Sequence, residues 1–239
     1  MIPKIIHQTI QDKKNVHDEF LFNINFLKEN NQNYRYYLYD DEDIINFIKK
    51  NYSNNILNYY NQINPIYGPA RADFFRYLLM YEIGGVYLDI KSTLDVPLEK
   101  VIKTNNYILS YWDNGPGKRF QGWGVHPNLG VANEFQQWHI IAPPKHPFLK
   151  AVISEVTWNI DNYSPSKYGV GKIGVLNVTG PLAYTKAILP IQSFYKHELL
   201  NIESLGFRYS ITGFPGSELN HEKLFPNHYS KSLEPIILR

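Results

Sequence analysis

The stretch GPARADFFRYLLMYEIGGVYLDIKS, residues 68–92, decides how this chain folds. Residues 69–83 are predicted to form a helix, because a proline stands in their first turn and a glycine follows their last residue. The pair Gly84-Gly85 lets the chain reverse tightly, since glycine adopts positive φ at little cost. Residues 86–89 are predicted to form a short strand. The stretch is therefore expected to be a helix and a strand joined by a sharp turn.

Geometry predicts that four charged side chains of this stretch converge. Arg76 precedes the double glycine by about 12 Å of helix, and Asp89 follows it by about 13 Å of strand. If the strand packs along the helix, the two side chains reach the same height. Asp73 shares a helix face with Arg76 and is expected beside Lys91. The group can hold sugar hydroxyls and a diphosphate, directly or through a divalent cation, whereas a surface ion pair and a solvated strand end are the structural alternative.

The segments around this stretch alternate between strand and helix. Strands are predicted at residues 2–7, 34–39, 107–112 and 136–142, and helices at residues 18–28, from the acidic cluster 40–43 to about 50, 146–160 and 180–189. Residues 51–65 are ambiguous. The alternation in the first half favours an α/β fold with a mostly parallel sheet. Because the chain has no repeat and no long linker, residues 1–239 are predicted to form one domain.

Composition excludes several classes of protein. The 239 residues contain no cysteine, which removes disulfides, thiolate zinc sites and cysteine nucleophiles. The 24 basic and 22 acidic side chains give a net charge of +2, too small for a typical nucleic-acid partner. No apolar stretch approaches the roughly 18 residues of a membrane span, and the first residues do not form a signal peptide. A cytoplasmic location is expected, with peripheral membrane contact left open.

Residues 68–92 resemble the signature of glycosyltransferase family 32, the sugar transferases with a DXD motif, which glucosyltransferase domains of large bacterial toxins share. Further resemblance lies in residues 2–9, 39–43, 142–147 and 179–181, and more weakly in 228–230. The resemblance implies a GT-A fold with one mostly parallel sheet flanked by helices. It also implies an enzyme that transfers a hexose from a nucleotide sugar, with retention of anomeric configuration. The expected donor is a UDP-sugar, and the expected acceptor is a glycan, a lipid-linked sugar or a protein.

The resemblance also assigns roles to residues. Asp73 and Arg76 would bind hydroxyls of the donor sugar, and Asp89 would match the first aspartate of the DXD motif. Residues of three separate segments would line the nucleotide pocket: His7, Gln8, Thr9, Tyr39, Asp40, Thr179 and Gly180. Helix capping is the structural alternative for Asp40 and for the Thr179-Gly180 pair.

Lys91 stands where the family has its second DXD aspartate. A protonated lysine cannot ligate a metal and repels one nearby. In one interpretation, Asp89 still meets Mn²⁺ or Mg²⁺, with His221 or His228 completing the shell. In a second, Lys91 neutralises the diphosphate and the metal is weak or absent. In a third, the chain is an inactive module that binds a nucleotide sugar or a carbohydrate.

Residues 113–126 are predicted to form a mobile loop near the acceptor. Their glycine clusters lack the Lys-Ser/Thr pair of a Walker phosphate loop. Trp112 and Trp123 are expected to be available for stacking on a sugar.

Overall fold

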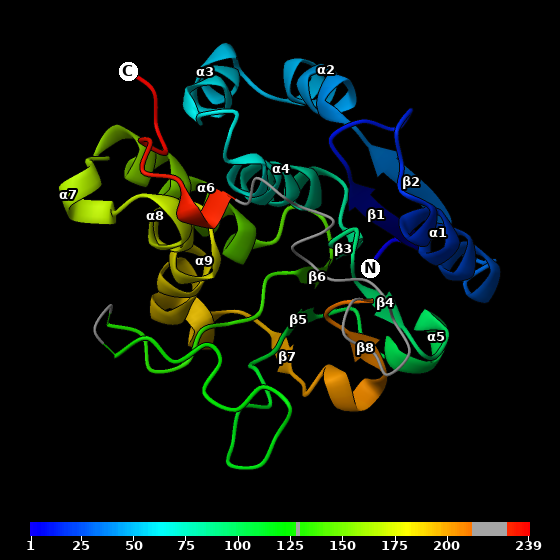
Figure 1. The fold of residues 1–239 in the computed structure, drawn as a ribbon. Coiled ribbons are helices and arrows are strands. Elements are labelled where there is room, and N and C mark those ends of the chain that lie inside the picture. The colour runs from blue at the N-terminus through cyan, green and yellow to red at the C-terminus, as the bar shows by residue number, and fades with distance from the viewer. Residues whose placement is uncertain (128–129, 212–228) are drawn as a thin grey trace.

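The computed structural model describes residues 1–127, 130–211 and 229–239, and its centre is a six-stranded sheet (Figure 1). The strands follow the order β2-β1-β3-β6-β5-β7. Five of them run in one direction, and β6 is antiparallel to both of its neighbours. The strands are β1 (Ile5–Thr9), β2 (Arg35–Tyr39), β3 (Gly85–Leu88), β5 (Tyr107–Leu109), β6 (His139–Ala142) and β7 (His197–Leu199). The predicted α/β fold with a mostly parallel sheet is confirmed, and a short ribbon of β4 (Thr93–Leu94) and β8 (Phe207–Arg208) accompanies it.

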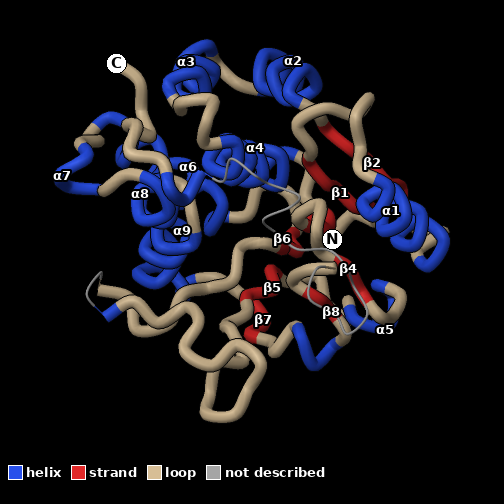
Figure 2. Tube along the Cα trace, in the orientation of Figure 1, coloured by secondary structure: helices blue, strands red, loops and turns tan. Residues whose placement is uncertain are grey.

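Helices cover both faces of the sheet (Figure 2). They are α1 (Asp18–Asn30), α2 (Asp41–Asn51), α3 (Asn54–Gln62), α4 (Gly68–Glu82), α5 (Leu98–Val101), α6 (Pro147–Asp161), α7 (Pro165–Tyr168), α8 (Gly171–Val178) and α9 (Pro181–Ile188). Short 3-10 turns occupy Leu189–Phe194, Glu203–Leu205 and Tyr229–Lys231. Within the described ranges, no helix combines the length and the apolar character that a membrane crossing requires.

The sheet separates two apolar cores. Successive side chains of a strand point to opposite faces, so Tyr87 of β3 joins the core with α4 and α6, while Val86 and Leu88 join the core with α1 and α5. β3 is buried along its whole length, which explains its almost unbroken apolar sequence. The strand that leads to Asp89 is therefore held from both sides.

Helix α4 lies between the sheet and the group of α6 and α8 (Figure 1). Pro69 occupies its first turn, where the missing N–H costs nothing. At its end, the N–H of Ile83 still donates to the carbonyls of Leu79 and Met80. Most of its side chains are buried, including Asp73 and Arg76. Buried charges on a core helix are costly unless they are paired. Asp73 and Arg76 therefore need partners of opposite charge or hydrogen-bond partners within the fold.

The double-glycine turn has no room for side chains. Gly84 and Gly85 have φ of +69° and +104°. A Cβ on Gly84 would lie 2.6 Å from the backbone nitrogen of Pro144, and one on Gly85 would lie 2.7 Å from the carbonyl oxygen of Ile5. Glycine is required here both for its backbone angles and for close packing against β1 and the segment after β6.

The element boundaries differ from prediction where polar residues are buried. β1 begins at Ile5 and continues through Thr9, because its register with β2 runs from Ile5–Arg35 to Thr9–Tyr39. Conversely, residues 110–112 and 136–138 lie outside the ladders. Ser110 and Gln136 bond to each other through their side chains. Residues 51–65, ambiguous in the sequence, contain α3.

Candidate active site

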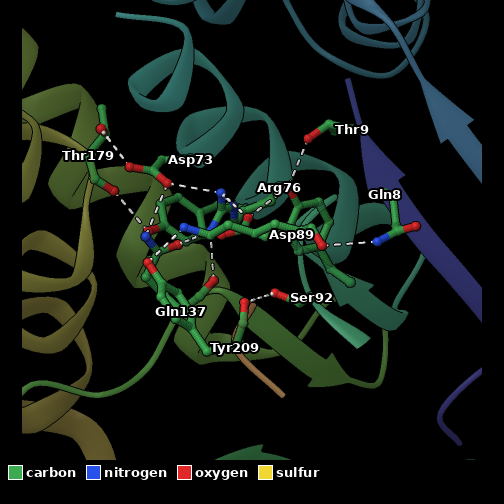
Figure 3. Close-up of polar contacts among 12 residues, drawn as sticks. Gln8, Thr9, Asp73, Arg76, Asp89, Ser92, Gln137, Thr179 and Tyr209 are labelled. Atoms are coloured by element: carbon green, nitrogen blue, oxygen red, sulfur yellow. Dashed lines mark hydrogen bonds and ion pairs between the residues drawn. The ribbon is translucent and has the colours of Figure 1, made fainter. Parts of the chain in front are cut away.

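Arg76 is the centre of a buried charge cluster at the end of β3 (Figure 3). Its Nη2 lies 3.1 Å from Oδ1 of Asp73, one helical turn before it, and 2.7 Å from Oδ1 of Asp89. Asp89 follows directly after β3, whereas Asp73 and Arg76 lie on α4, on the other side of the double-glycine turn. The convergence of Asp73, Arg76 and Asp89 that spacing predicted is therefore present in the structure.

Gln137 completes this cluster, although sequence reasoning missed it. Nη1 of Arg76 donates to the Gln137 carbonyl at 2.8 Å and also to its Oε1. Nε2 of Gln137 donates to Oδ1 of Asp73 at 3.1 Å. Gln137 lies just before β6, and the pairing of β6 with β3 brings it beside Asp89. A single glutamine carries no sequence signal, so only the strand order reveals it.

The cluster contains two carboxylates and one guanidinium in a dry environment. Burial raises the pKa of Asp73 to about 7; the charge of Arg76 lowers it and that of Asp89 raises it. Burial alone would lower the pKa of Arg76, but Asp89 and the other anionic neighbours raise it above its ordinary value, so the guanidinium stays charged. The two ends of the cluster differ in exposure, because the Asp89 side chain is 23% exposed and those of Asp73 and Arg76 only 5% and 4%. Asp89 is thus the part of the cluster that solvent and a ligand can reach.

Two of the residues predicted at the nucleotide pocket contact the Asp89 region. Nε2 of Gln8 donates to the Asp89 carbonyl at 2.9 Å. Oγ1 of Thr9 lies 2.8 Å from the hydroxyl of Tyr87. That hydroxyl reaches Oδ1 of Asp89 at 3.5 Å, and the Arg76 guanidinium lies 4.7 Å from the centre of the Tyr87 ring. Both residues therefore hold the strand end in place.

Thr179 also belongs to the cluster. Its Oγ1 donates to Oδ2 of Asp73 at 3.2 Å, and its carbonyl accepts from Tyr77 at 2.8 Å. Gly180 is the N-cap residue of α9, and its N–H donates to the Val175 carbonyl at 2.8 Å. Thr179 thus reaches a charged residue of the site, whereas the Gly180 amide is engaged within the chain.

His7, Tyr39 and Asp40 lie outside the charge cluster. Nε2 of His7 donates to the Gly84 carbonyl at 3.0 Å, and its Nδ1 accepts from the Tyr39 hydroxyl at 3.1 Å. Burial lowers the pKa of His7 to about 4, against the opposing effect of the Gly84 carbonyl, so the ring is neutral. Asp40 caps α2 and accepts from the N–H of Asp43 at 3.0 Å. The structure shows for Asp40 the capping role that was the alternative interpretation.

Lys91 contacts Tyr209 through its side chain. Its Nζ donates to the hydroxyl of Tyr209 at 2.8 Å and lies 4.2 Å from the centre of that ring. Asp73 was expected beside Lys91; among the described residues the ion pairs of Asp73 include Arg76 and not Lys91, and the chain turns after Asp89 and joins the β4–β8 ribbon. Lys91 remains two residues from Asp89, at the same end of β3.

The described residues do not by themselves form a metal site. In residues 1–127, 130–211 and 229–239, no three His, Asp or Glu side chains gather as a metal ion would require. Oδ1 of Asp89 already receives the Arg76 guanidinium. His221 and His228, predicted as further ligands, lie outside the described residues.

Comparison with known proteins agrees with this geometry. Residues 17–108 match the family model of the glycosyltransferase sugar-binding region containing the DXD motif. This match confirms the resemblance drawn from residues 68–92. The computed structure is similar to the PaToxG glycosyltransferase, with a TM-score of 0.56 and 16% identity over 80% of this chain and 70% of that chain. That likeness establishes a shared fold.

Two curated relatives from Schizosaccharomyces pombe extend the comparison. The initiation-specific alpha-1,6-mannosyltransferase is 28% identical over 204 residues, which cover 79% of this chain and 48% of the relative. Inositol phosphoceramide mannosyltransferase 1 is 25% identical over 159 residues, which cover 65% of this chain and 43% of the relative. The chain thus spans about half the length of these relatives.

Proposed function

We propose, from the match to the DXD glycosyltransferases and the geometry of the site, that this protein transfers a hexose from a nucleoside diphosphate sugar to a hydroxyl acceptor, with retention of configuration. The observation that carries the proposal is Arg76, which joins Asp73 and Asp89 across the double-glycine turn. Mannose is the hexose that the names of both relatives favour. The donor nucleotide, expected from the sequence to be UDP, stays a prediction.

The transfer breaks one bond and forms another at the anomeric carbon. The bond to the diphosphate breaks, the acceptor oxygen bonds to the carbon, and the acceptor's proton is released. The leaving diphosphate gains negative charge, which nearby cationic groups stabilise. Lys91 is the cation proposed for this role, because it lies at the same strand end as Asp89. Asp89, the exposed carboxylate of the cluster, is proposed to contact the donor.

Asp73 and Arg76 are proposed to position Asp89. Both are almost fully buried, and Arg76 already bonds two carboxylates and Gln137. These partners fix the Arg76 guanidinium in place, and the guanidinium in turn fixes the carboxylate of Asp89. Asp89 is thus pre-organised and needs no rearrangement when the donor binds. This role differs from the sugar contacts that the family resemblance implies for the pair.

A divalent cation is the second candidate source of positive charge. Such a cation would bridge Asp89 and the donor diphosphate. Among the described residues, no three acidic or histidine side chains gather to hold it, and the Asp73 carboxylate is already paired with Arg76; Lys91 is a cation itself. We therefore propose that Lys91 takes over much of the charge neutralisation that a second aspartate and its metal would provide.

A binding module without catalysis is the second candidate function. The lysine at the position of the second DXD aspartate favours it, since this position would otherwise supply a metal ligand. Such a module would bind nucleotide sugars without releasing nucleotide.

One set of measurements separates the two functions. Thermal stabilisation by a panel of UDP- and GDP-sugars, with and without Mn²⁺, identifies the donor, because a bound ligand raises the melting temperature. Nucleotide release with that donor then reports turnover. Asp89→Asn is expected to abolish turnover, whereas Asp161→Asn, an aspartate at the end of α6, keeps it. Binding without turnover in the wild type supports the module, and full turnover in Asp89→Asn contradicts the site assignment.

A further inference from the structure

The turn that follows β3 carries both charged groups proposed to meet the donor. It is closed by the N–H of Ser92, which donates to the Asp89 carbonyl at 2.8 Å. A hydrogen-bonded turn keeps its first and last Cα atoms within about 7 Å, so Lys91 stays close to Asp89. We infer that Tyr209 is a positioning residue of this site, which holds the Lys91 ammonium at the end of β3 where the diphosphate of the donor would lie. The inference rests on the proposed function and adds a residue outside the family-matched residues 17–108.

Tyr209 contacts Lys91 in two ways. Its hydroxyl accepts from Nζ of Lys91 at 2.8 Å, and the centre of its ring lies 4.2 Å from the same nitrogen. A hydroxyl oxygen and a ring face both attract a cation, and neither neutralises it. The ion pairs among the described residues do not include Lys91. Its positive charge therefore remains available to an anionic ligand, and the hydroxyl accepts only one of its three N–H donors.

The backbone fixes Tyr209 opposite Lys91. The ribbon of β4 and β8 brings the two segments together, and hydrogen bonds continue beyond its paired residues. Oγ of Ser92 donates to the Tyr209 carbonyl at 2.7 Å (Figure 3). The N–H of Ile211 donates to the Lys91 carbonyl at 2.7 Å. The two segments are thus tied together on both sides of the contact between Lys91 and Tyr209.

Buried aromatic rings fix the Tyr209 side chain. The rings of Trp112 and Trp138 meet the tyrosine ring nearly edge-on, with centroids 5.2 and 5.8 Å away and interplanar angles of 83° and 69°. These two tryptophans are 8% and 3% exposed, and close packing leaves buried rings little freedom. Trp112, which was expected to be available for stacking on a sugar, is used in this packing instead. Tyr209 therefore offers Lys91 a surface whose position is set before any ligand binds.

Pre-organisation is the physical reason for this role. A lysine side chain that is free in solvent samples many rotamers, and immobilising it when a ligand binds weakens that binding. By holding the ammonium beforehand, Tyr209 would remove part of this cost. Its hydroxyl supplies the hydrogen bond, whereas its ring supplies the packing and the cation–π contact. The two contributions can be separated, because phenylalanine keeps the ring and lacks the hydroxyl.

The test is a double-mutant cycle with Tyr209→Phe, Lys91→Met and the variant that carries both. Calorimetry with UDP and with GDP, in EDTA, measures the dissociation constant of the nucleotide without requiring turnover. We expect the wild type to bind at least one of the two nucleotides. Lys91→Met should bind it about ten- to a hundredfold more weakly, because a hydrogen bond from a charged group is lost. Tyr209→Phe should bind it about three- to tenfold more weakly, because the nucleotide must then immobilise Lys91 itself.

The double variant distinguishes positioning from packing. If the Tyr209 hydroxyl acts through Lys91, Tyr209→Phe should cause no further loss of affinity in a chain that already carries Lys91→Met. A merely structural role would weaken binding equally with and without Lys91. The matched control is Tyr59→Phe on α3, because the Tyr59 hydroxyl also bonds a charged side chain, donating to Oδ2 of Asp161 at 2.8 Å. This control should bind the nucleotide within about twofold of the wild type.

The inference is overturned by any of three results. These are a wild type that binds neither nucleotide in EDTA, a Tyr209→Phe or Lys91→Met variant that binds as tightly as the wild type or more tightly, and losses of the two single variants that add in the double variant. The cycle itself does not depend on sugar transfer. A confirmed cycle in a protein that releases no nucleotide from a sugar donor would contradict only the proposed transfer, whereas donor turnover with an additive cycle would contradict only the role of Tyr209.

Discussion

Replacing Arg76 with methionine should destabilise this protein, and the loss should grow with pH. The substitution keeps most of the side-chain volume but removes the guanidinium that bonds Asp73 and Asp89. Asp73 is 4% exposed, so its carboxylate would remain buried without a counter-charge. Removing one partner of a buried ion pair costs about 3–5 kcal/mol. This is a large share of the roughly 5–15 kcal/mol that stabilises a typical domain.

The pH dependence follows from the pKa of Asp73. Burial raises it to about 7 in the folded wild type, against about 3.9 in an unfolded chain. Between these values the folded state binds more protons, so the contribution of Asp73 to stability falls as pH rises to 7 and is constant above it. Without Arg76, which lowers this pKa, the fall should continue above pH 7 by about 1.4 kcal/mol per pH unit. Between pH 7.0 and 8.5 the variant should lose about 2 kcal/mol more.

Urea unfolding at pH 7.0 and 8.5 measures this difference. The wild type should show almost equal free energies of unfolding at the two values. The double variant Asp73→Asn/Arg76→Met has no buried carboxyl at residue 73 and should lose the extra pH dependence. If the free energy of unfolding of Arg76→Met is the same at both pH values, the reasoning about Asp73 is refuted.

Three further perturbations test other parts of the structure. Gly85→Ala would place a Cβ 2.7 Å from the Ile5 carbonyl at φ +104°, so urea unfolding should show a loss of about 1–3 kcal/mol beyond that of Gly117→Ala, where φ is +74° and the space is open. Burial lowers the pKa of His139 to about 3, so the free energy of unfolding should fall as pH decreases below about 6.5. His139→Gln should reduce the slope of that free energy against pH by up to about 1.4 kcal/mol per pH unit. An unchanged slope would contradict the buried, neutral state of His139. Nucleotide release should persist in EDTA if Lys91 supplies the positive charge, whereas loss in EDTA and recovery with Mn²⁺ would place a cation at Asp89.

The centre of the site could be predicted because it depends on local geometry. Arg76 and Asp89 are related by an ideal helix, a glycine turn and an ideal strand, and their 2.7 Å contact matches that construction. Thr179 was also expected near the site, and its bond to Asp73 places it there. Within a helix and a strand joined by a tight turn, the relative positions of residues follow from the rise per residue and from side-chain alternation.

The contacts that were missed depend on pairing between distant segments. Gln137 reaches Arg76 because β6 pairs with β3, and Lys91 turns to Tyr209 because β4 pairs with β8. No spacing rule in the sequence specifies either pairing. His7 was expected to line the nucleotide pocket. Its two ring nitrogens bond the Tyr39 hydroxyl and the Gly84 carbonyl. The contact with Gly84 is possible because the double-glycine turn packs closely against β1.

The charge cluster and a small cavity, lined by residues of the segments 113–120 and 203–209, come from different parts of the chain. Asp73, Arg76 and Asp89 lie within the family-matched residues 17–108, whereas every residue that lines the cavity comes after them. The cavity wall is formed by two segments, residues 113–120, which follow β5, and residues 203–209, which follow β7. Because none of Asp73, Arg76 and Asp89 lies in these two segments, substitutions in either segment can reshape the cavity wall while the residues of the charge cluster stay the same.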